Sequence, residues 1–155
     1  MKKIVYLHGL ESETNCPKVN YLRKLGHNVF NPPMDYKSKN CFEITLDSVK
    51  MFEPDLIIGS SMGGYFAYEI GKHLDVPVVL LNPALHSRSF EPKVDSLGDK
   101  DPLVYLIVGE NDDVINYEKT LNYLDENANC FFRSNYFKGK HGHRTPVNAL
   151  KTIKI

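Results

Sequence analysis

The sequence lacks several features that would place it in a specialised class of protein. Its 19 basic and 19 acidic residues leave no formal net charge, which argues against a surface built for nucleic acid or an anionic membrane. No apolar run approaches the roughly 18 residues that a membrane span needs. Three widely spaced cysteines, an odd number, favour reduced thiols over a disulfide framework. These absences predict a soluble cytoplasmic protein that binds neither nucleic acid nor a membrane.

Motifs for bound metals and nucleotides are missing as well. The histidine, cysteine and acidic residues do not fall at metal-ligand spacing, and no Gly-x-x-x-x-Gly-Lys-Ser/Thr loop is present to hold phosphate. We therefore expect no metal and no cofactor. With 42% hydrophobic and 25% charged residues, the chain of 155 residues suits a single domain, residues 1–155, around a core of ordinary size.

Short apolar runs alternate with segments of helical periodicity along the chain. The predicted strands are residues 3–7, 28–30, 55–58, 77–81, 103–108 and 130–137. The predicted helices lie within residues 12–26, 44–52, 65–74, 117–124 and 147–155. This alternation predicts an α/β fold, a doubly wound and mainly parallel sheet of about six strands with helices on both faces.

One glycine-rich stretch, Gly-Ser-Ser-Met-Gly-Gly at residues 59–64, separates a predicted strand from a predicted helix. A Gly-x-Ser-x-Gly sequence between a strand and a helix is typical of a nucleophile elbow, the sharp turn that exposes a catalytic serine. Such a turn leaves no room for side chains two positions before and after the nucleophile. Glycines flank Ser61 in this way, whereas Ser60 has larger side chains at both positions. Ser61 is therefore the candidate nucleophile.

Other reactive clusters also follow predicted strands. They are His8-Gly9-Leu10 after the first strand, Asp112 and Asp113 after the fifth, and a loop with His141 and His143 after the last. The carboxyl ends of parallel strands meet at one edge of the sheet, where ligands bind in such folds. A serine nucleophile needs a base, usually a histidine oriented by a carboxylate, and donors for the oxyanion. The chain supplies candidates for each part.

The order serine, aspartate, histidine resembles the α/β-hydrolase superfamily. More narrowly, the chain is similar to small bacterial serine esterases, which carry a Tyr-Leu-His-Gly start, a Gly-Ser-Ser-x-Gly-Gly-Tyr elbow and a later Asn-Pro pair. These motifs stand here at residues 6–9, 59–65 and 82–83. The resemblance implies a minimal α/β-hydrolase fold and places the oxyanion donors on the backbone N–H groups of Leu10 and Met62. It also implies that His8 shapes its loop and transfers no proton.

The acid and the base each have two candidates. Residues 109–114 are similar to the family's Gly-x-x-Asp-x-Val pattern, which favours Asp112 over its neighbour Asp113. His143 follows a glycine and precedes a Thr-Pro helix start, as the superfamily's histidine often does. His141 fits a Gly-x-His pattern of some relatives. We favour His143 and leave His141 open.

We therefore expect a serine hydrolase that cleaves a small carboxylic ester or thioester through an acyl-enzyme, with Ser61, His143 and Asp112 as the triad. About seventeen residues separate Asn82-Pro83 from the next strand, too few for a lid of several helices, so the site should be open and shallow. One alternative is a catalytically inactive hydrolase-fold binding protein. Another is a flavodoxin-like nucleotide-binding domain, which the single glycine after the first strand disfavours.

Overall fold

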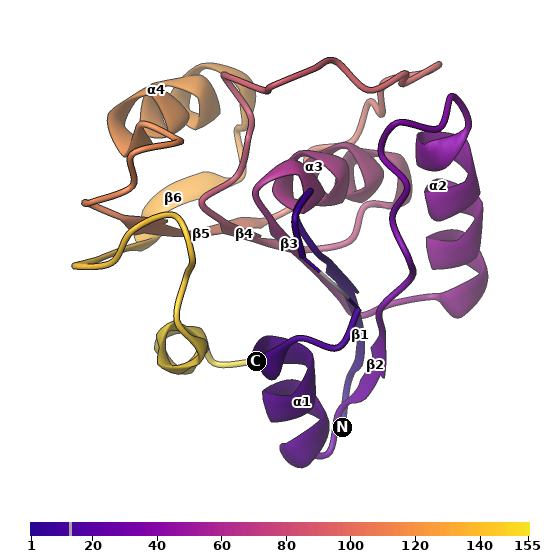
Figure 1. The fold of residues 1–155 in the computed structure, drawn as a ribbon, viewed down its shortest axis with the longest axis horizontal. Helices are drawn as coiled ribbons and strands as arrows, with labels where there is room; N and C mark the ends of the chain where they lie inside the picture. Colours follow the sequence, from indigo (N-terminus) through magenta and orange to yellow (C-terminus); the bar gives the residue numbers. More distant parts are fainter. Residues whose placement is uncertain (13) are drawn as a thin grey trace.

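The computed structural model describes residues 1–12 and 14–155 (Figure 1). Within these residues, one sheet contains six strands: β1 (Lys3–Leu7), β2 (Asn28–Phe30), β3 (Leu56–Ser60), β4 (Val78–Leu81), β5 (Val104–Gly109) and β6 (Phe131–Gly139). The strand order is β2-β1-β3-β4-β5-β6, and every neighbouring pair is parallel. The predicted doubly wound sheet is confirmed.

The strands form where continuous apolar runs can be buried on both faces. Each of the four residues of β4, Val-Val-Leu-Leu, is buried, as expected for a central strand of a parallel sheet. Alternate side chains point to opposite faces, so Val5 and Leu7 of β1 join one part of the core, and Ile4 and Tyr6 join the other. The sheet therefore divides the core into two layers.

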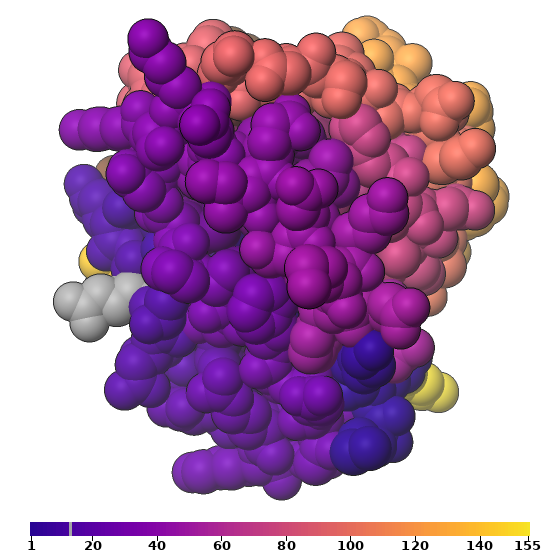
Figure 2. Space-filling view, turned by 90° about the vertical axis from the view of Figure 1, so that its right-hand side faces the viewer, coloured from indigo at the N-terminus to yellow at the C-terminus, as the bar shows by residue number. Residues whose placement is uncertain are grey.

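Helices cover both layers (Figure 1). On one face lie α2 (Cys41–Phe52), α3 (Met62–Leu74) and α4 (Tyr117–Asn127), whose apolar residues share a core cluster. The opposite face is covered by α1 (Pro17–Lys24) and a short 3₁₀ helix, η1 (Val147–Thr152). Figure 2, which faces the α2 side, shows the segment after β4 lying beside the start of α2.

The helices differ from the sequence-based expectation in where they begin and end; α2, for example, begins at Cys41 instead of residue 44. The final segment is a six-residue 3₁₀ helix instead of the expected closing helix over 147–155. Leu150 within η1 and Ile153 directly after it are both buried and lie three residues apart, a spacing that matches the three residues per turn of a 3₁₀ helix. Helix α3 begins at Met62, before the expected residue 65, so it contains both Gly63 and Gly64.

The order of the strands along the chain reverses direction between β1 and β3. From β1 the chain passes to β2 on one side and then to β3 on the other side, so β1 and β3 flank a topological switch point. Ligands of open α/β sheets bind beyond the carboxyl ends of strands at such a point. No helix of the described residues is both long and apolar enough to cross a membrane.

Candidate active site

Ser61 occupies the sharp turn between β3 and α3, at the switch point. Its backbone has φ +55° and ψ −118°, a conformation that L-residues rarely adopt and that costs roughly 1–3 kcal/mol. The loop after β1 lies against it, because a Cβ built on Gly9 would be 3.3 Å from the Cβ of Ser61. The turn therefore holds the Ser61 hydroxyl beside the end of β1, in the geometry of a nucleophile elbow.

The flanking glycines are required by close packing. A Cβ on Gly59 would lie 2.6 Å from the Cβ of Ala67, and one on Gly63 would lie 2.6 Å from the carbonyl oxygen of His8. Both distances are far below van der Waals contact. The steric rule that selected Ser61 from the sequence therefore has a direct counterpart in the packing of α3 against β1 and β3.

A continuous hydrogen-bonded array joins Ser61, His143 and Asp112. Nε2 of His143 lies 3.0 Å from Oγ of Ser61, and Nδ1 of His143 lies 2.9 Å from Oδ2 of Asp112. With Nδ1–H donating to the carboxylate, Nε2 is left to accept the serine proton. The structure thus brings together the three residues that the sequence singled out, from the ends of β3, β5 and β6.

Asp112 is held more rigidly than its neighbours in the array. Its side chain is 0% exposed, compared with 27% for His143. The second carboxylate oxygen, Oδ1, accepts hydrogen bonds from the backbone N–H groups of Val114 at 2.8 Å and Ile115 at 2.9 Å. Each oxygen of this buried carboxylate therefore has a fixed partner, and the imidazole is oriented by a group that cannot rotate freely.

The two alternative candidates lie outside this array. The His141 ring packs on the backbone of Gly139, where a Cβ would approach its Cδ2 to 2.7 Å, and its Nδ1 bonds the carbonyl of Gly142 at 3.0 Å. Asp113 is exposed. In the part of the chain that the structure describes, no hydrogen bond links either residue to Ser61.

The two backbone groups expected to form the oxyanion hole are both available. Met62 is the first residue of α3, and Leu10 follows Gly9 in the loop after β1. Among the described residues, neither N–H group donates a hydrogen bond to a backbone carbonyl outside a helix or strand. The dipole of α3 adds partial positive charge beside Met62. An oxygen bearing developing negative charge could therefore be stabilised between them.

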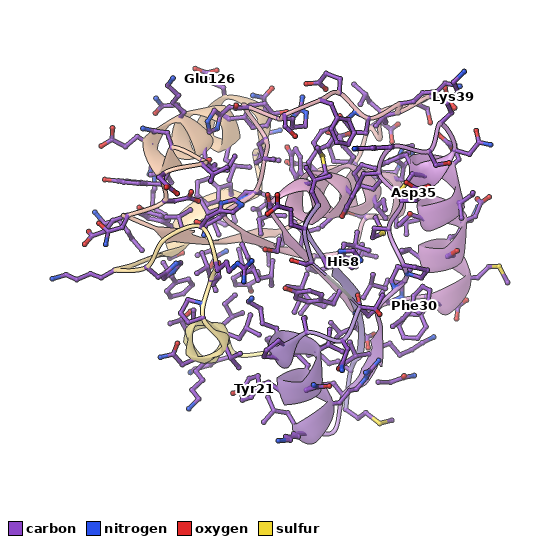
Figure 3. The ribbon with its side chains drawn as sticks, viewed as in Figure 1. His8, Tyr21, Phe30, Asp35, Lys39 and Glu126 are labelled. Carbon is purple, nitrogen blue, oxygen red and sulfur yellow. The ribbon has the colours of Figure 1, made fainter. Side chains whose placement is uncertain are left out.

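His8 is directed into its own loop. Its Nδ1 donates to the carbonyl of Gly9 at 2.8 Å, and its own carbonyl accepts a hydrogen bond from the hydroxyl of Tyr36. In the view of Figure 3, His8 lies near the middle of the molecule, with Asp35, next to Tyr36, toward the start of α2. Burial raises the pKa of Tyr36, so its hydroxyl stays a donor well into the alkaline range. Tyr36 and His8 thus fix the backbone that leads to Leu10.

Comparison with known proteins identifies the family of the chain. The model of an uncharacterised protein family, UPF0227, matches residues 3–101, more than half of the chain. The chain belongs to the UPF0227 family. The UPF0227 protein YcfP of Escherichia coli is 25% identical over an alignment 178 residues long, gaps included. The alignment covers 97% of this chain and 99% of YcfP.

Solved structures establish the fold of this UPF0227 protein. A Xanthomonas campestris protein described as a hydrolase of the alpha/beta superfamily has a TM-score of 0.74, 14% identity and coverage of 98% of this chain and 94% of its own. Mouse alpha/beta hydrolase domain-containing protein 10 has a TM-score of 0.73 and 12% identity, and the match covers 97% of this chain and 86% of the mouse chain. A monoacylglycerol lipase from Paleococcus ferrophilus has a TM-score of 0.67 and 13% identity, and the match covers 92% of this chain and 86% of the lipase. The UPF0227 protein therefore has the α/β-hydrolase fold.

The connection from β4 to β5 lies beside the elbow helix of the UPF0227 protein and contains no helix in residues 82–103. Arg88 anchors it by donating to the carbonyls of Ala84 at 2.9 Å and Leu85 at 2.8 Å, and its guanidinium lies 4.0 Å from the ring centre of Tyr65. This cation–π contact fastens the connection to α3. No helical lid therefore arises from this part of the chain.

Two hollows of the molecule do not contain the array. One, of about 410 Å³, lies between residues 36–39 and 90–93, and the other, of about 360 Å³, lies between β6, the histidine loop and η1. Ser61 and His143 line neither of them. Within residues 1–12 and 14–155, no group of three histidine, cysteine or acidic side chains is arranged to hold a metal ion.

The sequence did not point to Tyr36 or assign a role to Asn82. Tyr36 stands in a polar loop that looks like an ordinary turn, so nothing local indicated that its hydroxyl reaches His8. Asn82 had a visible signal, an amide side chain directly after a fully apolar strand. Its partners, however, lie 27 and 60–63 residues further along the chain, beyond the reach of any local pattern.

Proposed function

We propose that this protein is a serine hydrolase that cleaves a small carboxylic ester or thioester through an acyl-enzyme. The observation that carries the proposal is the array of Ser61, His143 and Asp112, with 3.0 Å and 2.9 Å between the bonded atoms. A strained serine, a histidine with one acceptor nitrogen facing it and a buried carboxylate behind that histidine are the parts that activation of a hydroxyl requires.

In the proposed first half-reaction, Ser61 Oγ attacks the carbonyl carbon while Nε2 of His143 takes the hydroxyl proton. The carbonyl oxygen becomes an oxyanion and receives hydrogen bonds from the N–H groups of Leu10 and Met62. The tetrahedral intermediate then collapses, the bond to the leaving alcohol or thiol breaks, and His143 returns the proton to the departing oxygen or sulfur. The acyl group remains bonded to Ser61.

Water completes the proposed cycle. Nε2 of His143 takes a proton from a water molecule, the water oxygen attacks the acyl carbon, and a second tetrahedral intermediate forms at the same oxyanion donors. Collapse of this intermediate breaks the bond to Ser61 Oγ, which recovers its proton from His143. A carboxylic acid leaves, and Asp112 has stabilised the imidazolium in both halves without itself gaining a proton.

The open surroundings of the array support a small substrate. The side chain of His143 is 27% exposed, and the β4–β5 connection forms no helical cover over the elbow. A long acyl chain gains its binding energy from an enclosing apolar channel, which such a site does not supply. We therefore propose short acyl groups, with either an oxygen or a sulfur leaving group.

A fluorophosphonate probe tests the proposal, because it bonds covalently to an activated serine. Wild type should be labelled, Ser61→Ala should not, and the neighbouring Ser60→Ala should be labelled as in wild type. The same three proteins should give a matching order of rates on short-chain chromogenic esters and thioesters. If wild type is labelled no better than Ser61→Ala, the hydrolase proposal is wrong and a non-catalytic binding protein becomes the better interpretation.

A further inference from the structure

The last residue of β4 and the segment that follows it contact the backbone of Ser61 on both sides. The carbonyl of Leu81 accepts a hydrogen bond from the N–H of Ser61 at 3.0 Å, and the N–H of Ala84 donates to the carbonyl of Ser61 at 2.9 Å. Between them, the N–H of Asn82 donates to Ile107 of β5 at 2.9 Å. Residues 81–84 thus hold the elbow, and Asn82 lies between the two residues that bond Ser61.

The Asn82 side chain is 1% exposed, and it connects β5 to the histidine loop. Its Oδ1 accepts a hydrogen bond from the N–H of Gly109 at 2.8 Å. Its Nδ2 donates to the backbone carbonyl of His143 at 2.8 Å and lies 3.2 Å from the carbonyl of Gly142 and 3.3 Å from Oγ1 of Thr145. One amide group therefore uses both its acceptor and its donors to bridge two loops.

Two of these contacts, to Gly109 and to His143, lead to members of the array. Gly109 ends β5, and its carbonyl accepts a hydrogen bond from the N–H of Asp112 at 3.2 Å. The contact to His143 is made to the residue's own carbonyl, so it fixes the Cα from which the imidazole projects. Asn82 thus bonds the backbone of His143 directly, and it is linked to the backbone of Asp112 through Gly109.

We infer that Asn82 is a positioning residue of the proposed hydrolase: it holds His143 and the turn of Asp112 so that the imidazole stays between Ser61 and the carboxylate. This inference rests on the proposed function. Among the hydrogen bonds of the described residues, none joins the Asn82 side chain to Oγ of Ser61 or to the imidazole, so Asn82 acts through the backbone of other residues.

An asparagine suits this position for two separable reasons. Its backbone has φ +41°, a left-handed conformation that asparagine and glycine tolerate better than other residues. Its amide also offers an acceptor and two donors at one end, whereas an aspartate would direct a second oxygen at two carbonyls. Replacement by glycine keeps the first property and removes the second, so the two can be tested apart.

The test compares Asn82→Gly and Asn82→Ala with Tyr68→Phe as a control. Tyr68→Phe removes another buried hydrogen bond, 3.2 Å to the carbonyl of Asn127, away from the array. Because small displacements of a catalytic group cost up to about 100-fold in rate, both Asn82 variants should lose about 10- to 100-fold in kcat on a short-chain ester, with little change in KM. Tyr68→Phe should keep the wild-type kcat. If Asn82→Gly also keeps the wild-type kcat, asparagine is needed at this position only for its left-handed backbone conformation, and the inference is overturned.

A double-mutant cycle separates positioning from general loss of structure. If Asn82 acts through His143, adding Asn82→Gly to His143→Ala should produce no further loss of residual turnover. An additional loss equal to that of Asn82→Gly alone would overturn the inference. Melting curves of Asn82→Gly and Tyr68→Phe show whether both variants are folded at the assay temperature, and Asn82→Gly stays informative if the alanine variant does not fold.

A crystal structure of Asn82→Gly gives a readout that does not depend on activity. The distance from His143 Nε2 to Ser61 Oγ should increase beyond hydrogen-bond reach in this variant and stay near 3.0 Å in Tyr68→Phe. If wild type shows no turnover and no probe labelling, the proposed hydrolase fails, and this distance still decides the role of Asn82. An unchanged distance overturns the positioning role, and an increased one supports it.

Discussion

Replacement of Asp112 by asparagine should abolish the proposed hydrolase activity while preserving the fold, because of the way the carboxylate is bound. Oδ1 accepts two backbone N–H groups, from Val114 and Ile115, and an amide oxygen can take that place without loss. The amide nitrogen must then occupy the position of Oδ2, 2.9 Å from Nδ1 of His143. An NH₂ group there donates a proton, so Nδ1 must become the acceptor.

The consequence is the wrong tautomer of His143. With Nδ1 as acceptor, the ring proton moves to Nε2, which faces Ser61 at 3.0 Å and can no longer take the hydroxyl proton. The corresponding change in serine proteases lowers kcat by about 10⁴-fold. At about 1.36 kcal/mol for each factor of ten, this is a loss of about 5.4 kcal/mol of transition-state stabilisation. We expect a similar loss in Asp112→Asn.

The assay is steady-state turnover of a short-chain chromogenic ester, together with thermal melting. Asp112→Asn should lose about 10⁴-fold in kcat with a melting temperature near that of wild type, since its two backbone N–H partners are retained. Asp113→Asn is the matched control, because Asp113 is exposed and should tolerate the change with unchanged turnover. If Asp112→Asn keeps more than about a tenth of the wild-type kcat, the proposed role of Asp112 is wrong, since the expected tautomer lock costs far more.

Three further predictions concern the base, the elbow and the dependence of stability on pH. His143→Ala should lower ester turnover by roughly 10²- to 10⁴-fold while His141→Ala keeps most of it, and the reverse order would refute the assignment of the base. Gly63→Ala should lower the melting temperature even though alanine is the better helix former, because its Cβ would meet the carbonyls at the end of β1; a raised melting temperature would contradict this packing. Burial raises the pKa values of Tyr36 and Tyr68, so above about pH 10 the unfolded chain releases phenolic protons that the folded chain keeps, and stability should fall. Urea unfolding between about pH 8 and pH 11 measures this fall, which Tyr36→Phe should reduce; an equally steep fall in the variant would exclude Tyr36 as a source.

The parts of the molecule that follow local rules could be predicted from the sequence. The strands are short apolar runs, and the choice of Ser61 over Ser60 depends on two glycines within two residues of it. The fold and the position of the nucleophile follow from such patterns because each is decided by neighbours in the chain. The 3₁₀ form of η1 could not be predicted in this way, because the burial of Leu150 in η1 and of Ile153 after it depends on packing against distant parts of the chain.

The choice between His141 and His143 depends on contacts between distant segments. The loop after β6 lies so close to β5 that a Cβ on Gly109 would be 2.6 Å from the carbonyl of Gly142, and Asn82 bonds the same loop from β4. These contacts set the path of the loop and turn the His143 ring toward Ser61, while the His141 ring packs on Gly139. Both residues follow the last strand at similar spacing, so the resemblance that favours His143 gives no information on where either ring points.

The lengths of the strands explain why the acid and the base reach the serine. Gly59, Leu80, Leu106 and Tyr136 are aligned across the sheet, and from that level β3 and β4 extend one residue further, whereas β5 and β6 extend three. At about 3.3 Å per residue, the last two strands project roughly 7 Å beyond the others, so the loops that follow them can reach over the elbow. Asn82 stands at the step between β4 and β5, where its amide bonds Gly109 in place of a longer strand. The positioning role of Asn82 is therefore a consequence of the sheet's geometry: the projection that brings His143 to Ser61 also leaves a gap at the end of β4, and this side chain fills it.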